Sequence, residues 1–221
     1  MKIFAITGSK GKSTVAWMLR AGLRACGAKV AMLSTIERDL CGDVTPAHAN
    51  LPGREGVDDF SLRASDVGAD ALILEATAWG LKQGWLDGLL VDVAILTNLR
   101  DGYHVPSGHP DRADYEASKR RLFERLRPGA LAIINLDEPG SSSFAKAAMT
   151  AGAAVRGYGE GPGRAWRWEL LEALPGAGRW IVKGRKESAE VVTPAGHHQG
   201  ANAAAAVAAL VESGYPAGAV A

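Results

Sequence analysis

Short apolar runs alternate along most of the chain with segments in which apolar residues recur every three or four positions. The apolar runs predict buried strands, and the recurring spacing predicts amphipathic helices. We expect strands at residues 2–7, 29–34, 70–75, 91–98, 130–135 and 154–158, and helices at residues 12–26, 57–67, 112–126 and 141–151. Because strands and helices alternate, the pattern predicts an α/β fold with a mainly parallel sheet covered by helices on both faces.

The pattern changes near the C-terminal end. Between residues 164 and 193, short apolar strands separated by Gly and Pro turns predict a small antiparallel β appendage. An alanine-rich helix is expected at 202–213. Residues 37–55, rich in Gly, Pro and Asp, form the largest predicted loop, and loops at sheet ends are common substrate sites. We expect residues 1–221 to form one domain.

Composition argues against several classes of function. Of the 221 residues, 47 % are apolar, which is enough for a substantial core. A formal net charge of +1 argues against a nucleic-acid partner held by bulk electrostatics. The two cysteines, Cys26 and Cys41, have neither a zinc-site spacing nor a disulfide framework. Because we find no signal peptide and no long apolar span, we expect a cytoplasmic chain without a membrane partner.

The first predicted strand runs directly into a glycine-punctuated turn. Gly8 and Gly11 allow a tight turn whose backbone N–H groups face an anion, and the helix that follows adds its positive end. Lys12 can reach the β- and γ-phosphates of a nucleoside triphosphate, and the Ser13 hydroxyl is placed to ligate magnesium. The sequence therefore predicts a P-loop-type sheet that binds a triphosphate.

This P-loop is a variant, because Ile6 stands where the strict pattern has its first glycine. The alternative is a plain glycine turn between a strand and a helix. The apolar strand before the turn, the amphipathic helix after it and the run Lys12-Ser13-Thr14 together favour phosphate binding.

Two further strands are expected to end in polar residues at the same edge of the sheet. The strand at 70–75 ends in Glu75, and the strand at 91–98 ends in Thr97 and Asn98. In open parallel sheets, ligands bind outside the carboxyl ends of the strands. Glu75 is therefore a candidate magnesium ligand, the alternatives being a helix cap or a salt-bridge partner.

Seven motifs occur in the order found in the Mur ligase superfamily, and together they make the chain resemble its central, ATP-binding domain. In the resemblance, residues 7–14 are the phosphate loop and residues 196–202 the segment that contacts adenine. The matching segments are 7–14, 45–46, 75–81, 97–98, 115–123, 135–138 and 196–202.

The resemblance implies an ATP-dependent, ADP-forming amide ligase. Such an enzyme phosphorylates a small-molecule or peptide carboxylate, and an amino-acid amine then attacks the acyl phosphate. ATP and Mg²⁺ are the implied cofactors. The residues that the resemblance places around ATP are Gly8, Ser9, Lys10, Gly11, Lys12, Ser13, Thr14, Asn98, Gln199 and Asn202.

The resemblance also implies catalytic and metal-binding roles. Lys119 corresponds to a family lysine that is carbamylated and supports a second magnesium; the alternative is an ordinary exposed lysine on a helix. The second-metal histidine is expected at His104 rather than His109, although Gly102 stands where the family has a histidine. The implied catalytic residues are Lys12, Lys119 and His104, the metal ligands Ser13, Glu75, His104 and Lys119, and the substrate residues Thr45 and Pro46.

Two domains of the family are not expected within these residues: an N-terminal domain for a UDP-sugar and a C-terminal domain that brings the amino acid. We therefore expect ligation to need a C-terminal domain or a partner subunit. The alternatives are a P-loop ATPase, or an ATP-binding module or scaffold without ligase activity. The residues Trp79 and Gly102, which depart from the family pattern, favour the scaffold.

Overall fold

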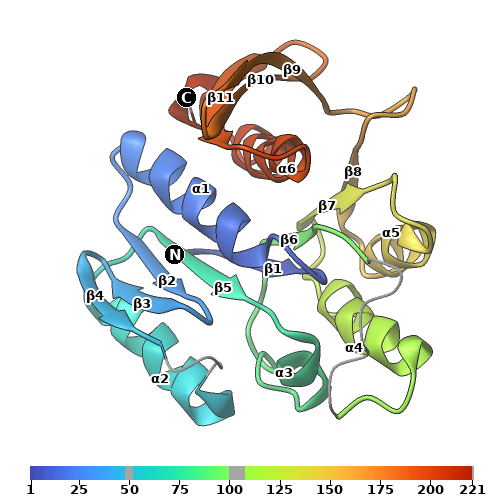
Figure 1. Ribbon diagram of the computed structural model, residues 1–221. Helices are drawn as coiled ribbons and strands as arrows, with labels where there is room; N and C mark the ends of the chain where they lie inside the picture. Colours follow the sequence, from blue (N-terminus) through green and yellow to red (C-terminus); the bar gives the residue numbers. More distant parts are fainter. Residues whose placement is uncertain (48–51, 100–107, 221) are drawn as a thin grey trace.

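The computed structural model describes residues 1–47, 52–99 and 108–220. Its largest feature is an eight-stranded sheet with the order β4-β3-β2-β5-β1-β6-β7-β8 (Figure 1). The strands are β1 (Lys2–Thr7), β2 (Val30–Leu33), β3 (Glu37–Leu40), β4 (Asp43–Pro46), β5 (Ala71–Glu75), β6 (Val93–Leu96), β7 (Leu131–Asn135) and β8 (Ala154–Tyr158). All neighbouring strands from β2 to β8 pair in parallel, which confirms the predicted α/β class.

Helices cover both faces of this sheet (Figure 1). One face packs against α1 (Lys12–Ala25) and α6 (His198–Glu212), and the other packs mainly against α2 (Gly53–Asp66), α4 (Arg112–Glu124) and α5 (Ser141–Thr150). The short helix α3 (Ala78–Lys82) follows β5, and a 3₁₀ turn, η1 (Ala217–Val220), follows α6. Each face therefore has its own apolar core, because side chains alternate between the two faces along every strand.

A second sheet lies on the far side of α6 (Figure 1). It is antiparallel, has the order β11-β10-β9 and contains β9 (Arg167–Leu174), β10 (Ala177–Lys183) and β11 (Ser188–Pro194). The predicted antiparallel appendage is thus confirmed. Helix α6 is enclosed from both sides: all residues from Ala203 to Leu210 are inaccessible to solvent.

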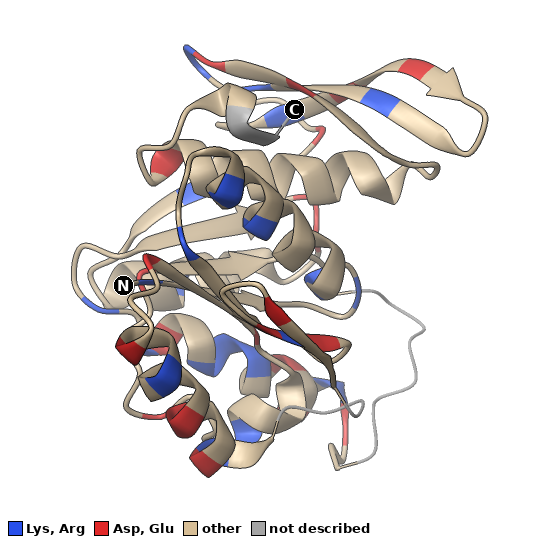
Figure 2. Ribbon diagram, turned by 90° about the vertical axis from the view of Figure 1, so that its left-hand side faces the viewer, with Lys and Arg blue, Asp and Glu red and all other residues tan. Residues whose placement is uncertain are grey.

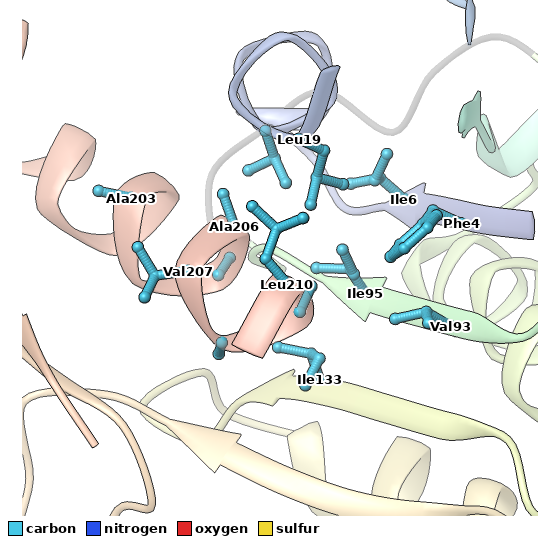
Figure 3. Packing of buried hydrophobic residues seen from close by; sticks show 14 of the residues in the cluster. Phe4, Ile6, Leu19, Val93, Ile95, Ile133, Ala203, Ala206, Val207 and Leu210 are labelled. Carbon is cyan, nitrogen blue, oxygen red and sulfur yellow. The ribbon is translucent and has the colours of Figure 1, made fainter. Parts of the chain in front are cut away.

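The alanine-rich sequence explains how α6 fits between the two sheets. Ala206 and Leu210 point towards Ile95 and Ile133 of the central strands (Figure 3). Small side chains allow a helix to approach its neighbours closely, and alanine has the highest helix propensity. The helix starts at His198, four residues earlier than predicted.

The predicted loop at 37–55 is wrong. Residues 37–46 form the antiparallel hairpin β3–β4, and α2 already begins at Gly53. The hairpin turns at Cys41 and Gly42, both with positive φ, as a tight two-residue turn requires. Strand β3 has no apolar sequence pattern, because its buried position 39 is an aspartate. This side chain is fully buried and forms ion pairs with Arg20 and Arg24 of α1 at 2.7 and 2.8 Å.

None of the helices in the described ranges is both long and apolar enough to cross a bilayer.

Candidate functional site

The turn between β1 and α1 is a loop that only glycine can form at two positions. Gly8 and Gly11 have φ of 148° and 83°. A Cβ at Gly8 would lie 1.9 Å from Thr97 Oγ1, and one at Gly11 would lie 2.4 Å from Asn202 Oδ1. The N-cap residue of α1 is Gly11, which has no side chain that could cap the first turn. The first backbone N–H groups of the helix are therefore left for an anion.

The end of β6 braces this loop. The Thr97 hydroxyl and the Asn98 amide donate to the Lys10 carbonyl oxygen at 2.7 and 2.9 Å, and the Lys10 N–H donates to Asn98 Oδ1 at 3.0 Å. Asn98 therefore stabilises the conformation of the loop through both the nitrogen and the oxygen of its side-chain amide. The contact between Asn98 and a nucleotide, expected from the sequence, stays a prediction.

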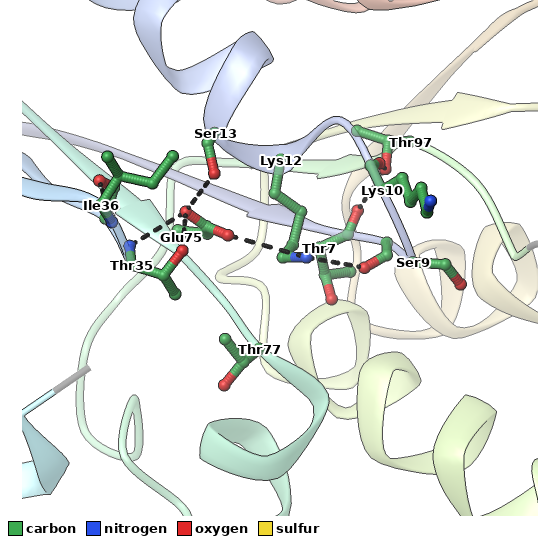
Figure 4. A network of polar contacts seen from close by, with 12 residues as sticks. Thr7, Ser9, Lys10, Lys12, Ser13, Thr35, Ile36, Glu75, Thr77 and Thr97 are labelled. Carbon is green, nitrogen blue, oxygen red and sulfur yellow. Dashed lines mark hydrogen bonds and ion pairs between the residues drawn. The ribbon is translucent and has the colours of Figure 1, made fainter. Parts of the chain in front are cut away.

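Glu75, at the end of β5, is the centre of the polar network drawn in Figure 4. Only 2 % of this residue is exposed. Its Oε2 accepts hydrogen bonds from Ser13 Oγ at 2.9 Å and from both the N–H and the hydroxyl of Thr35 at 3.1 Å. Lys12 Nζ lies 3.7 Å from Glu75 Oε1 (Figure 4). The predicted pair of oxygen donors, Ser13 and Glu75, is therefore brought together.

Two lysines from different helices converge on one carbonyl group. Lys12 Nζ donates to the Gly8 carbonyl oxygen at 3.2 Å, and Lys119 Nζ donates to the same oxygen at 2.8 Å. Lys119 is 1 % exposed, which contradicts the alternative of an ordinary surface lysine. The site thus holds two amines beside the single carboxylate of Glu75, an arrangement that favours a bound anion.

Burial alters the protonation of both amines. Loss of water around the Lys12 ammonium lowers its pKa, although the Glu75 carboxylate opposes the shift. The pKa of Lys119 lies well below the usual lysine value, mainly because of burial and then because of repulsion by Lys12, with Glu75 again opposing. Lys119 is therefore more readily neutral than a solvated lysine, and a neutral amine is nucleophilic.

Tyr115 and His109 form the wall of the site on the α4 side. Lys119 Nζ lies 4.4 Å from the centre of the Tyr115 ring, and the Tyr115 hydroxyl donates to Ser9 Oγ at 3.3 Å. The His109 side chain is fully buried, with Nδ1 2.7 Å from Asp114 Oδ2. Hydrogen bonds from Lys82 and then His109 lower the pKa of Asp114. His109 Nε2 is buried and has no hydrogen-bond partner among the described residues.

The predicted adenine-side residues lie in the first turn of α6. Asn202 Nδ2 donates to Gln199 Oε1 at 3.0 Å, and Asn202 Oδ1 faces the space beside Gly11. Asn202 therefore connects this turn to the phosphate loop. Gln199 is half-buried, and its contact with a base stays a prediction.

Two other predicted residues, Thr45 and Pro46, lie away from the phosphate loop. Thr45 and Pro46 are exposed on the edge strand β4, and Thr45 lines a cavity next to α2. His104 lies outside the described residues, so its expected role as a metal ligand stays a prediction. Within the described ranges no group of three or more His, Cys, Asp or Glu side chains gathers closely enough to hold a metal ion by itself. A metal here would depend on Ser13, Glu75 and its own phosphate and water ligands.

Sequence reasoning missed Thr35. Its backbone N–H and its hydroxyl both donate to Glu75, and it lies two residues after the end of β2. The position of Thr35 could have indicated this role, because residues that follow parallel strands gather at the same edge of the sheet. Tyr115 was noted only as part of a motif, although it contacts both Ser9 and Lys119.

The fold and the loop define a phosphate-binding α/β domain of the P-loop type. Comparisons with known proteins specify the family. Residues 6–210 match the sequence model of the protein family described as Mur ligase middle domain. The chain belongs to this family.

Its relatives are ligases. UDP-N-acetylmuramoyl-L-alanyl-D-glutamate–2,6-diaminopimelate ligase of Caulobacter vibrioides is 33 % identical over 163 residues, which are 71 % of this chain and 33 % of the relative. A solved structure of a ligase of that name superposes with a TM-score of 0.83 at 23 % identity and covers 100 % of this chain and 45 % of the other. A folylpolyglutamate synthase/dihydrofolate synthase crystallised with Mn, AMPPNP and L-glutamate has a TM-score of 0.64 at 22 % identity over 97 % of this chain and 54 % of the other. The chain spans about a third of the curated relative's length.

Proposed function

We propose that this chain is the ATP-binding part of an ATP-dependent, ADP-forming amide ligase that works through an acyl phosphate. The observation that carries the proposal is the convergence of Lys12 and Lys119 on the Gly8 carbonyl oxygen, beside the Ser13–Glu75 pair. The family supports the same chemistry, since its relatives are named as ligases and one was crystallised with an ATP analogue.

The residues of the loop fit a magnesium nucleotide. Ser13 and Glu75 supply hard oxygen donors, and the Thr7 hydroxyl at the base of the loop is buried without a hydrogen-bond partner among the described residues. When bound, Mg²⁺ would neutralise phosphate charge. The loop backbone and Lys12 would hold the β- and γ-phosphates, and Lys12 would stay charged through its contact with them.

The reaction transfers the γ-phosphoryl group to a carboxylate. A carboxylate oxygen attacks the γ-phosphorus, ADP leaves, and the amine then attacks the acyl carbon and expels inorganic phosphate. Positioning and charge neutralisation dominate such a step. Two substrates follow: a small-molecule or peptide carboxylate, with Thr45 and Pro46 on its expected side, and an amino-acid amine brought by another domain or a partner subunit.

Lys119 would act as a carbamate. Its neutral amine attacks CO₂, forms an N–C bond and loses one proton, so a neutral amine becomes an anionic carbamate. Burial and the lowered pKa of Lys119 favour this reaction, because only the neutral amine reacts. The carbamate oxygens would then be ligands of a second divalent cation next to the acyl phosphate. His104, which the resemblance to the family suggests as a metal ligand, would be a further ligand.

The test combines two measurements. In ¹³C-bicarbonate, the protein should show one carbamate carbonyl signal in its NMR spectrum that Lys119→Gln removes and that Lys146→Gln, on α5, retains. The full-length protein, as its gene encodes it, should release ADP only when both a carboxylate and an amine are supplied. ADP release that never depends on an amine would instead support a plain ATPase, and loss of neither signal nor activity in Lys119→Gln would contradict the role of Lys119.

A further inference from the structure

A second cavity lies away from the phosphate loop, between the β3–β4 hairpin and α2. Its volume is about 230 Å³, and its walls come from β2, β3, β4 and α2. In Figure 1, α2 lies along the outer side of this hairpin. None of the residues that we place around the nucleotide lines it; Thr45, expected on the substrate side, does.

The register of the hairpin determines which side chains face this cavity. Leu33 pairs with Arg38, and Arg38 pairs with Thr45, so these three side chains lie on the same face of the sheet. The next residue, Asp39, points the opposite way, to the arginines of α1. The face of the hairpin towards α2 therefore carries a guanidinium and a hydroxyl side by side.

The guanidinium of Arg38 lacks an acceptor. Its Nε is buried without a hydrogen-bond partner, and no hydrogen bond or ion pair joins its side chain to any of the described residues. The Arg38 residue as a whole is half-buried, and a buried N–H donor such as its Nε is rarely left without an acceptor in folded proteins. Arg38 differs in this from Arg20 and Arg24, which both bind Asp39 from the other side of the sheet.

Two acidic side chains line the same cavity as Arg38, but neither forms an ion pair with it. Asp43 lines the cavity, two residues before Thr45, but forms no ion pair with Arg38. Asp59 lines the α2 wall and lies 3.9 Å from Arg63, a distant and exposed pair. Arg63 lines the cavity too, so Asp59 and Arg63 offset each other, and the charges left over are the Arg38 guanidinium and the Asp43 carboxylate. Together these two are complementary to a zwitterion.

The remaining walls limit the size of the ligand. Leu33, Leu40 and Phe60 form an apolar part of the lining. The volume of about 230 Å³ is below the range of pockets for drug-sized ligands, which starts at about 300 Å³. A small molecule with a short apolar stem fits these dimensions.

We infer that this pocket binds a small free α-amino acid. The carboxylate pairs with the Arg38 guanidinium and the Thr45 hydroxyl, the ammonium faces Asp43, and the side chain packs on Leu40 and Phe60. Arginine suits this role because its planar fork binds a carboxylate through two hydrogen bonds.

The end of β2 contributes residues to both the pocket and the proposed reaction site. Leu33 is two residues before Thr35, which binds Glu75 through two hydrogen bonds. As a substrate subsite the pocket rests on the proposed function, but as a binding site it does not. The two proposals can therefore fail separately.

The experiment is an NMR titration of the ¹⁵N-labelled protein with L-alanine, acetate and ethylamine as three probes. We expect L-alanine to bind in the millimolar range, more tightly than either half-ligand, and to shift the amides of Leu33, Thr45 and Phe60. Arg38→Gln should weaken L-alanine binding about tenfold or more, and Arg38→Lys should weaken it less, since charge remains but the fork is lost. Asp43→Asn should weaken binding of L-alanine but not of acetate.

A matched control is Arg54→Gln, an exposed arginine on α2 that lies 3.6 Å from Asp58 and does not line the pocket. It should leave L-alanine binding unchanged. Equal binding to Arg38→Gln and the parent, or equal affinity for acetate and L-alanine, would overturn the inference. If Arg38→Gln fails to fold, Asp43→Asn, at an exposed position, decides alone. ATP titration of the same samples reports on the proposed function independently.

Discussion

Two regions of this molecule contain Lys–Glu pairs, and they use them differently. In the phosphate-loop site, Lys12 and Glu75 are 3.7 Å apart with side chains 15 % and 3 % exposed. In the three-stranded sheet, Lys183 and Glu169 are closer, at 2.8 Å, but 49 % and 63 % exposed. Figure 2 shows charged residues along this outer sheet as well as on the helices.

Burial, rather than the distance between the two charged groups, determines how the pKa values of each pair shift. Around the loop, burial lowers the pKa of Lys12 despite its neighbour Glu75, because water no longer stabilises the ammonium. In the outer sheet, the hydrogen bond from Lys183 lowers the pKa of Glu169, so here the partner dominates. In the first region the Glu75 carboxylate does not offset the loss of water around the Lys12 ammonium, so a bound anion would stabilise its charged form, whereas the second pair is already balanced.

The largest effect that would sharpen this comparison is expected from Gly8→Ala. The added Cβ would meet Thr97 Oγ1 at 1.9 Å in a backbone with φ of 148°. The loop would have to change shape, so ATP binding should be lost and the protein should lose about 2–3 kcal/mol of stability. Urea unfolding and fluorescent-ATP binding measure the two effects.

The matched control is Gly27→Ala, just after α1. This glycine also has positive φ, at 80°, but a Cβ would meet nothing within 4 Å. Only backbone strain of about 1 kcal/mol is expected there, with normal ATP affinity. Similar losses of ATP binding in both variants would contradict a specific role of the Gly8 loop in ATP binding.

The next largest effect is expected from Lys12→Ala. Removing the amine that lies beside Gly8 and Glu75 should weaken ATP binding by about tenfold or more, because a charge-assisted contact to phosphate is lost. Stability without ATP should change less, since a partly desolvated ammonium is removed at the same time. Unchanged ATP affinity would favour the scaffold alternative; Lys186→Ala, an exposed lysine outside the site, is the control.

Much of the loop site was predictable because its signals are local. Glycine spacing and the run Lys12-Ser13 stand next to each other in the sequence, and Glu75 ends a clearly apolar strand. The parallel sheet followed from the same alternation of strands and helices. Neither required knowledge of distant contacts.

The remaining parts depend on such contacts. Strand β3 is charged, and it is stabilised by arginines about 15–19 residues earlier in the chain, which periodicity does not reveal. Thr35 binds Glu75 partly through its backbone N–H, which any residue but proline possesses. Asn98 and Asn202 were expected to bind the nucleotide, which stays a prediction; in the structure Asn98 bonds to Lys10 and Asn202 bonds to Gln199.

A smaller effect is expected from the pH dependence of stability. The folded pKa of Lys119 lies well below the unfolded value. Between these two pKa values the unfolded chain binds a proton that the folded chain has released, so the free energy of unfolding rises with pH. Above the unfolded value the increase stops.

Lys119→Met lacks this group, so its stability should rise less between neutral pH and about pH 10 than that of the parent. Urea unfolding in CO₂-free buffer measures the difference without carbamylation. Lys186→Met, which removes an exposed lysine, should follow the parent curve. Parallel curves for Lys119→Met and the parent would show that the Lys119 amine is solvated in solution.

The smallest effect is expected at the shorter of the two Lys–Glu pairs. Lys183→Met removes the hydrogen bond to Glu169, so the pKa of Glu169 should rise towards its usual value, which NMR titration of the carboxyl carbon detects. The unfolding midpoint should not move measurably, because solvent screens both side chains and already hydrates them in the unfolded chain. A loss of stability as large as that of Gly8→Ala would break the comparison: it would mean that the outer sheet depends on its charge pairs as strongly as the loop depends on its glycines.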